Sequence, residues 1–96
     1  MAWRVVFKAQ ARKFLSNLGR AEQRKVKAKI SLLMNALENA IPPYAVPGLD
    51  FKKLKGYQDI FRIRIGSVRI ILNIDVNSRT ITVLRAGERG KIYKGM

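Results

Sequence analysis

The sequence predicts an α+β domain in which two helices cover one face of a small antiparallel β-sheet. Three observations support this fold class. Apolar residues recur at helical spacing between residues 9 and 41. From Ile60 to Ala86 the apolar residues follow a strand pattern, interrupted by turn-forming residues at Gly66-Ser67 and Asn77-Ser78. The chain has 96 residues, which suits a single domain over residues 1–96.

The N-terminal half predicts a strand followed by a helical hairpin. WRVVFK alternates in the manner of a strand, with Trp3, Val5 and Phe7 on one face. A helix is expected over AQARKFLSNL, and Gly19 is expected to end it in the left-handed conformation. The second helix should be stopped by Pro42 and Pro43, which cannot donate a backbone hydrogen bond. Its apolar stripe consists of Val26, Ile30, Leu33, Leu37 and Ile41.

The C-terminal half predicts strands, and a short strand is expected before them at FKKLK. Gly66-Ser67 suits a two-residue type II′ turn, which sets Arg64 opposite Arg69 and Arg62 opposite Ile71. The face under the helices then carries Phe61, Ile63, Ile65, Val68, Ile70, Leu72 and Ile74. The opposite, open face carries Arg62, Arg64, Arg69, Asn73 and Thr82. Like charges directly opposite cost up to about 1 kcal/mol, so we interpret the open face as an anion-binding surface.

The composition favours a nucleic-acid partner and excludes several kinds of catalysis. Lys and Arg number 20 against 6 Asp and Glu, a formal net charge of +14, which indicates attraction to a polyanion. Without cysteine or histidine, the chain has no thiolate and no imidazole base. The acids are scattered, so no metal site and no other cofactor are expected. No apolar run approaches the ~20 residues of a membrane span, and we expect a cytoplasmic protein without a membrane partner.

An ordered set of short motifs gives the chain a resemblance to a known family. With Lys53 before it, the stretch LKGYQDIFRIRIGSVRIILNI gives K-L-x-G, F-R-x-R and G-x-x-R-I in order, and G-x-R-x-x-x-Y follows at residues 87–93. With the preceding strand and helical hairpin, this pattern resembles the RelE/ParE superfamily of toxins from toxin–antitoxin pairs. The resemblance covers almost the whole chain. The end at Met96 is similar to the shorter archaeal RelE type.

The resemblance implies a metal-independent endoribonuclease that cuts messenger RNA in the ribosomal decoding site. The implied partners are messenger RNA, the ribosome with its rRNA, and an acidic antitoxin that folds across the helices and the sheet. The implied catalytic residues are Arg62, Arg69, Arg89 and Tyr93. The expected RNA-binding residues are Arg64, Lys53, Lys55, Lys91 and Lys94. Some relatives carry lysines where this chain has arginines, and arginines stay charged.

The residues themselves are compatible with one way of cutting RNA. A 2′-hydroxyl can attack the adjacent phosphorus if a proton acceptor, a proton donor and stabilising cations are present. The arginines could clamp the phosphate, and Tyr93 could accept the proton or stack on a base. Two alternatives stay open at this point: a ParE-like inhibitor of DNA gyrase, and a non-catalytic RNA-binding or ribosomal protein.

Overall fold

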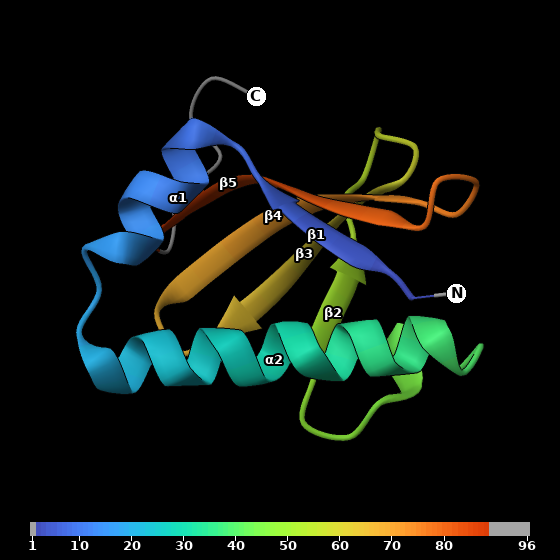
Figure 1. Cartoon of the computed structure of the whole chain (residues 1–96), viewed down its shortest axis with the longest axis horizontal. Helices are drawn as coiled ribbons and strands as arrows, with labels where there is room; N and C mark the ends of the chain where they lie inside the picture. The colour runs from blue at the N-terminus through green and yellow to red at the C-terminus, as the bar shows by residue number, and fades with distance from the viewer. Residues whose placement is uncertain (1, 89–96) are drawn as a thin grey trace.

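A computed structural model describes residues 2–88 of the chain, and in it two helices cover one face of a five-stranded sheet (Figure 1). The helices are α1 (Ala9–Ser16) and α2 (Arg20–Glu38), and a short 3-10 helix, η1 (Pro43–Ala45), follows them. The strands are β1 (Arg4–Phe7), β2 (Asp50–Lys53), β3 (Ile60–Ile65), β4 (Val68–Asp75) and β5 (Thr80–Glu88). The predicted α+β fold class is confirmed.

The β3–β4 hairpin has the predicted register. Arg64 pairs with Arg69 and Arg62 pairs with Ile71. The turn depends on Gly66, whose φ of 58° lies in the left-handed region required at the first position of a type II′ turn. Because the register is correct, the apolar and basic residues of this hairpin separate onto the two faces as expected.

The sheet is not entirely antiparallel, because β1 runs parallel to β5. The strand order is β1-β5-β4-β3-β2, and Arg4 of β1 pairs with Thr80 of β5. Only the β1–β5 pair is parallel among the strand pairs of residues 2–88. A strand that leads into a parallel pairing needs a long connection across one face of the sheet. Helices α1 and α2 lie in the chain between the two strands and cover that face.

The connection between the helices differs from the prediction. Gly19 has φ −64° and ψ 161°, an extended conformation, and it is the N-cap of α2. The expected left-handed cap at Gly19 is therefore wrong. Helix α1 already ends at Ser16, so the short connection places Gly19 at the start of the next helix rather than at the end of the previous one. Glycine is well accepted at an N-cap.

The end of α2 also lies earlier than expected. The helix stops at Glu38, before either proline, and Ala40 takes a left-handed φ of 55°. Ile41 is consequently not part of the apolar stripe and is 46% exposed. Neither helix within residues 2–88 combines the length and the apolar character that crossing a bilayer requires.

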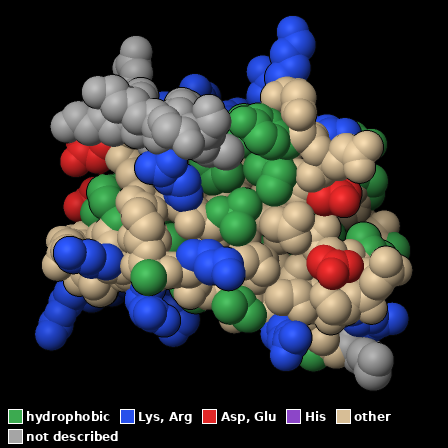
Figure 2. Space-filling view, turned by 90° about the horizontal axis from the view of Figure 1, so that it is seen from above, with side chains coloured by type: hydrophobic (Ala, Val, Ile, Leu, Met, Phe, Trp, Pro, Cys, Tyr) green, Lys and Arg blue, Asp and Glu red, His purple; other side chains and the backbone are tan. Residues whose placement is uncertain are grey.

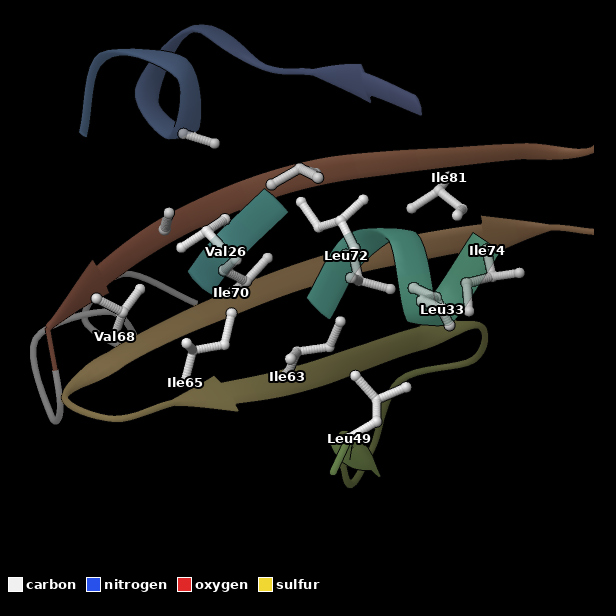
Figure 3. Close-up of a cluster of buried hydrophobic side chains, with 14 of the residues drawn as sticks. Val26, Leu33, Leu49, Ile63, Ile65, Val68, Ile70, Leu72, Ile74 and Ile81 are labelled. Carbon is white, nitrogen blue, oxygen red and sulfur yellow. The ribbon is translucent and has the colours of Figure 1, made fainter. Parts of the chain in front are cut away.

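The core lies between the sheet and the helices (Figure 3). Ile63, Ile70, Leu72 and Ile81 project from neighbouring strands and are fully buried. From α2, Leu33 is also fully buried and meets this layer. The members of the cluster that Figure 3 labels are Val26, Leu33, Leu49, Ile63, Ile65, Val68, Ile70, Leu72, Ile74 and Ile81. Burial of one sheet face leaves the other face for polar and charged residues.

Candidate functional site

Basic side chains from four neighbouring strands share the sheet face that points away from the helices. The strand pairing sets Lys52 opposite Arg62, and Arg64 opposite Arg69. On the other side of β4, Arg85 pairs with Ile71. We define the arginine face as Lys52, Arg62, Arg64, Arg69 and Arg85. In the view of Figure 2, Lys and Arg side chains are spread over the visible surface, and Asp and Glu side chains lie towards the left and the right of the picture.

Arg85 belongs to this face because of a β-bulge in β5. Leu72 pairs with Val83, but the next residue of β4, Ile71, pairs with Arg85. One additional residue of β5, Leu84, therefore lies between the two pairings, and such a bulge turns the following side chains to the opposite faces. Strict alternation from Val83 would have assigned Arg85 to the core. No strong local signal in the sequence marks the bulge, and it is the structure that shows Ala86, three residues after Val83, buried in the core cluster.

The arginine face has an apolar residue at its centre. Ile71 is fully buried although it points away from the main core cluster. Its cross-strand neighbours are Arg62 on β3 and Arg85 on β5. Arginine stems pack along apolar surface while the guanidinium group stays at the edge. Such packing around Ile71 limits the directions in which these two arginines can extend.

Two arginines of β3 are bridged by one carboxylate. The Nη2 atom of Arg62 lies 3.3 Å from Oδ1 of Asp50, and Nε of Arg64 lies 2.6 Å from Oδ2. The side chain of Arg62 is only 14% exposed, whereas that of Arg64 is 54% exposed. Arg64 is therefore the member of the pair that a bound ligand reaches more easily.

Arg69 is oriented by the hairpin turn next to it. Its Nη1 atom donates hydrogen bonds to the carbonyl oxygens of Gly66 at 2.7 Å and of Val68 at 3.2 Å. These two contacts hold the guanidinium group at the end of the β3–β4 hairpin. The remaining donors of the fork can still bind a phosphate.

The structure brings together only some of the residues predicted for the site. Arg62, Arg64 and Arg69 share one face, as predicted. Lys53 pairs with Phe61 and so belongs to the opposite face, while Lys52 takes the place on the arginine face. Lys55 lies in the loop after β2, beside a shallow hollow that Tyr57 also lines. The predicted residues Arg89, Lys91, Tyr93 and Lys94 lie outside the described residues.

A second surface feature is a groove on the helix side of the sheet, between α1, α2 and β1. Its volume is about 520 Å³. Phe7, Leu15 and Met34 contribute half-buried apolar surface to it. Two exposed basic residues, Arg12 and Lys27, also line it. We call this feature the helix-side groove. Among residues 2–88 no group of three or more acidic side chains gathers in a way that could hold a metal ion.

Comparisons with known proteins found one similar sequence and several similar structures. No family model matches the chain. A stretch of 45 residues is 49% identical to Toxin RelE3 of Methanocaldococcus jannaschii, covering 47% of this chain and 49% of that protein. The match thus spans about half of the length of that relative.

Solved structures match over nearly the whole chain. RelE in the archaeal RelE–RelB complex of Pyrococcus horikoshii has 27% identity and a TM-score of 0.74, covering 95% of this chain and 99% of that one. The RelB–RelE complex of Methanococcus jannaschii matches at 26% identity and a TM-score of 0.67, with 88% and 89% covered. The E. coli RelBE complex, at 22% identity, shows the same fold, with a TM-score of 0.70 and 94% and 100% covered.

The structural matches show that this small basic protein has a RelE-type fold, with two helices on one face of the sheet and arginines on the other. In fold and in sequence the chain is similar to RelE proteins, among them archaeal ones.

Proposed function

We propose that the chain is the toxin of a type II toxin–antitoxin pair. In this proposal it is a metal-independent endoribonuclease that cuts messenger RNA in the ribosomal decoding site in the cytoplasm. The observation that carries the proposal is the arginine face, in which Arg62, Arg64, Arg69 and Arg85 lie on one sheet face of a RelE-type fold. An array of guanidinium groups of this kind is suited to binding several phosphates of one strand.

The proposed reaction uses the RNA as its own nucleophile. The 2′-oxygen bonds to the adjacent phosphorus as its proton passes to an acceptor. The bond from phosphorus to the 5′-oxygen breaks, and the leaving oxygen takes a proton from a donor, which gives a 2′,3′-cyclic phosphate and a 5′-hydroxyl. Arg62, Arg69 and Arg89 would stabilise the negative charge that develops at phosphorus. Arg64, the more exposed arginine of β3, would hold the neighbouring backbone. Tyr93 would accept the proton or stack on a base.

The proposal is tested with purified protein and programmed ribosomes. We expect cleavage of ribosome-bound message in the presence of a metal chelator, and little or no cleavage of the same message without ribosomes. Tight RNA binding without cleavage would instead show a non-catalytic RNA-binding protein. Inhibition of DNA gyrase without cleavage would show the ParE-like alternative.

The helix-side groove supports the proposal that an acidic antitoxin is the protein partner. The structural neighbours include RelE chains solved in complex with RelB. In this chain the groove offers apolar surface from Phe7, Leu15 and Met34 beside the charges of Arg12 and Lys27. A partner segment that combines acidic residues with apolar anchors is complementary to such a surface. A second copy of this chain is not, because its net charge is +14.

We expect Met34→Glu to weaken binding of the acidic partner by about 30-fold or more, the effect of losing a well-packed anchor. The added carboxylate would occupy the groove and repel the partner's acids. The measurement is the affinity of the partner that co-purifies with this chain from its native host. Ala28→Glu, an exposed site on the same helix that does not line the groove, should change affinity less than threefold. Equal effects of the two variants, or the absence of any small acidic protein, would contradict the assignment.

A further inference from the structure

We propose that Asp50 is a built-in counter-anion of the arginine face, which occupies a phosphate position between Arg62 and Arg64 until RNA competes for it. The inference deepens the proposed RNA-binding function and rests on it. Asp50 is not among the residues that the motifs single out. It enters the arginine face only because β2 pairs with β3.

The geometry around Asp50 is that of a bound anion. Each carboxylate oxygen contacts a different guanidinium group, Oδ1 with Arg62 at 3.3 Å and Oδ2 with Arg64 at 2.6 Å. A phosphate that bridges two arginines uses two of its oxygens in the same way. Because Asp50 is directly opposite Arg64 in the sheet, its carboxylate lies on the same face as both cations.

The backbone that carries Asp50 is firmly attached. The preceding residue, Leu49, is 6% exposed and belongs to the core cluster. One residue earlier, the carbonyl oxygen of Gly48 accepts a hydrogen bond from Nζ of Lys29 on α2, at 2.5 Å. The residues after Asp50 pair with β3. Asp50 therefore cannot leave as part of a loop, and a competing phosphate must instead draw the arginine away from it.

The two arginines differ in their ability to make this exchange. Arg62 is 14% exposed and lies beside the buried Ile71 on the neighbouring strand, so it has little room to move. Arg64 is 54% exposed and contacts Asp50 through Nε, so more of its guanidinium group is open to a ligand than that of Arg62. RNA should therefore bind first to Arg64, while Arg62 keeps Asp50 neutralised.

The consequence is a lower affinity for RNA than the arginines alone would provide. A carboxylate within about 4 Å of a phosphate opposes binding by about fivefold even in a water-like dielectric. The net free energy gained from the phosphate contact of Arg64 is also smaller, because this arginine must give up its contact with Asp50 to make it. Removing the carboxylate charge should strengthen binding and add one full phosphate contact.

The test compares Asp50→Asn with Asp59→Asn, using a single-stranded RNA oligonucleotide and the full chain. Asp59 has a left-handed φ of 59°, a conformation that asparagine tolerates equally well. The Asp59→Asn substitution therefore removes the same charge as Asp50→Asn without straining the backbone. Asp59 immediately precedes β3 and is five residues from Arg64, about 17 Å along an extended chain, which exceeds the Debye length of about 10 Å at 0.1 M salt. We expect about fivefold tighter binding for Asp50→Asn and less than twofold for Asp59→Asn. The log–log salt slope should steepen by about 0.7 for Asp50→Asn alone.

A second comparison separates a specific site from general charge. In an Arg64→Gln background, Asp50→Asn should improve binding no more than Asp59→Asn does, because the phosphate contact is then missing. Persistence of the fivefold gain in that background would overturn the proposal. Weaker binding by folded Asp50→Asn would also overturn it, and would mean that Asp50 only orients the arginines. Thermal unfolding of each variant identifies any that fail to fold, and Asp50→Ser then replaces Asp50→Asn.

A final comparison distinguishes failure of this inference from failure of the proposed function. Inorganic polyphosphate carries closely spaced phosphates without bases or riboses, and it serves as the second probe. If the chain binds polyphosphate but not RNA, the RNA function is wrong. The Asp50 inference is then decided by the polyphosphate titration alone. If the chain binds RNA but does not cut it on ribosomes, only the catalytic proposal is lost. Equal affinities of Asp50→Asn and Asp59→Asn for both probes would overturn the counter-anion role.

Discussion

Arg89→Ala is expected to slow single-turnover cleavage of message on programmed ribosomes by about 100-fold or more. This is the scale of losing one donor that stabilises charge in the transition state. The assignment rests on the position of Arg89 in the G-x-R-x-x-x-Y motif at residues 87–93 and on the family resemblance. Affinity for RNA should fall much less, because the arginine face supplies other cations to the backbone.

The control for this prediction is Arg24→Ala, which removes the same charge from an exposed position of α2. We expect it to leave the cleavage rate within about twofold, since a distant charge is screened. Thermal unfolding of both variants checks that the fold is retained. If Arg89→Ala lowered rate and affinity by the same factor, Arg89 would be a binding residue and not a catalytic one.

Leu33→Ala should lower the free energy of unfolding by about 2–5 kcal/mol. Leu33 is fully buried and joins α2 to the sheet, so the truncation removes packing and leaves a cavity. The free energy of unfolding of native proteins is about 5–15 kcal/mol. The variant should therefore lose a large part of its stability. Chemical denaturation followed by circular dichroism gives the measurement.

Val76→Ala is the matched control for Leu33→Ala. It also shortens an apolar side chain, but Val76 is 70% exposed in the turn after β4. Its effect should stay within about 0.5 kcal/mol. If the two variants were equally stable, the packing of α2 on the sheet would not contribute to the fold as the core cluster indicates.

The parts of the structure that were predictable from the sequence depend on local chemistry. Gly66 favours one turn type, and that turn determines which residues of β3 and β4 face each other. Alternation along those strands then separates the core from the arginine face. Arg62, Arg64 and Arg69 could be placed together in this way, without knowledge of any distant contact.

The parts that were not predictable depend on pairings or irregularities without a strong local signal. The bulge at Leu84 brings Arg85 to the arginine face, against the alternation of its neighbours. Asp50 reaches Arg62 and Arg64 only through the β2–β3 pairing, and the same pairing selects Lys52 over Lys53. Glycine occurs both at the ends and at the N-caps of helices, so the residue type of Gly19 does not show which of the two positions it takes.

The parallel pairing of β1 with β5 has a consequence for how the protein is made. Arg4 and Thr80 are 76 residues apart, and Nε of Arg4 donates a hydrogen bond to the hydroxyl of Thr80 at 3.0 Å. β1 therefore leaves the ribosome before its partner strand and cannot pair until β5 has followed. Contacts this far apart in sequence form late and slow folding. A chain that still lacks β5 has no pairing partner for β1 and no Arg85, so the arginine face can be completed only after β5 has been synthesised.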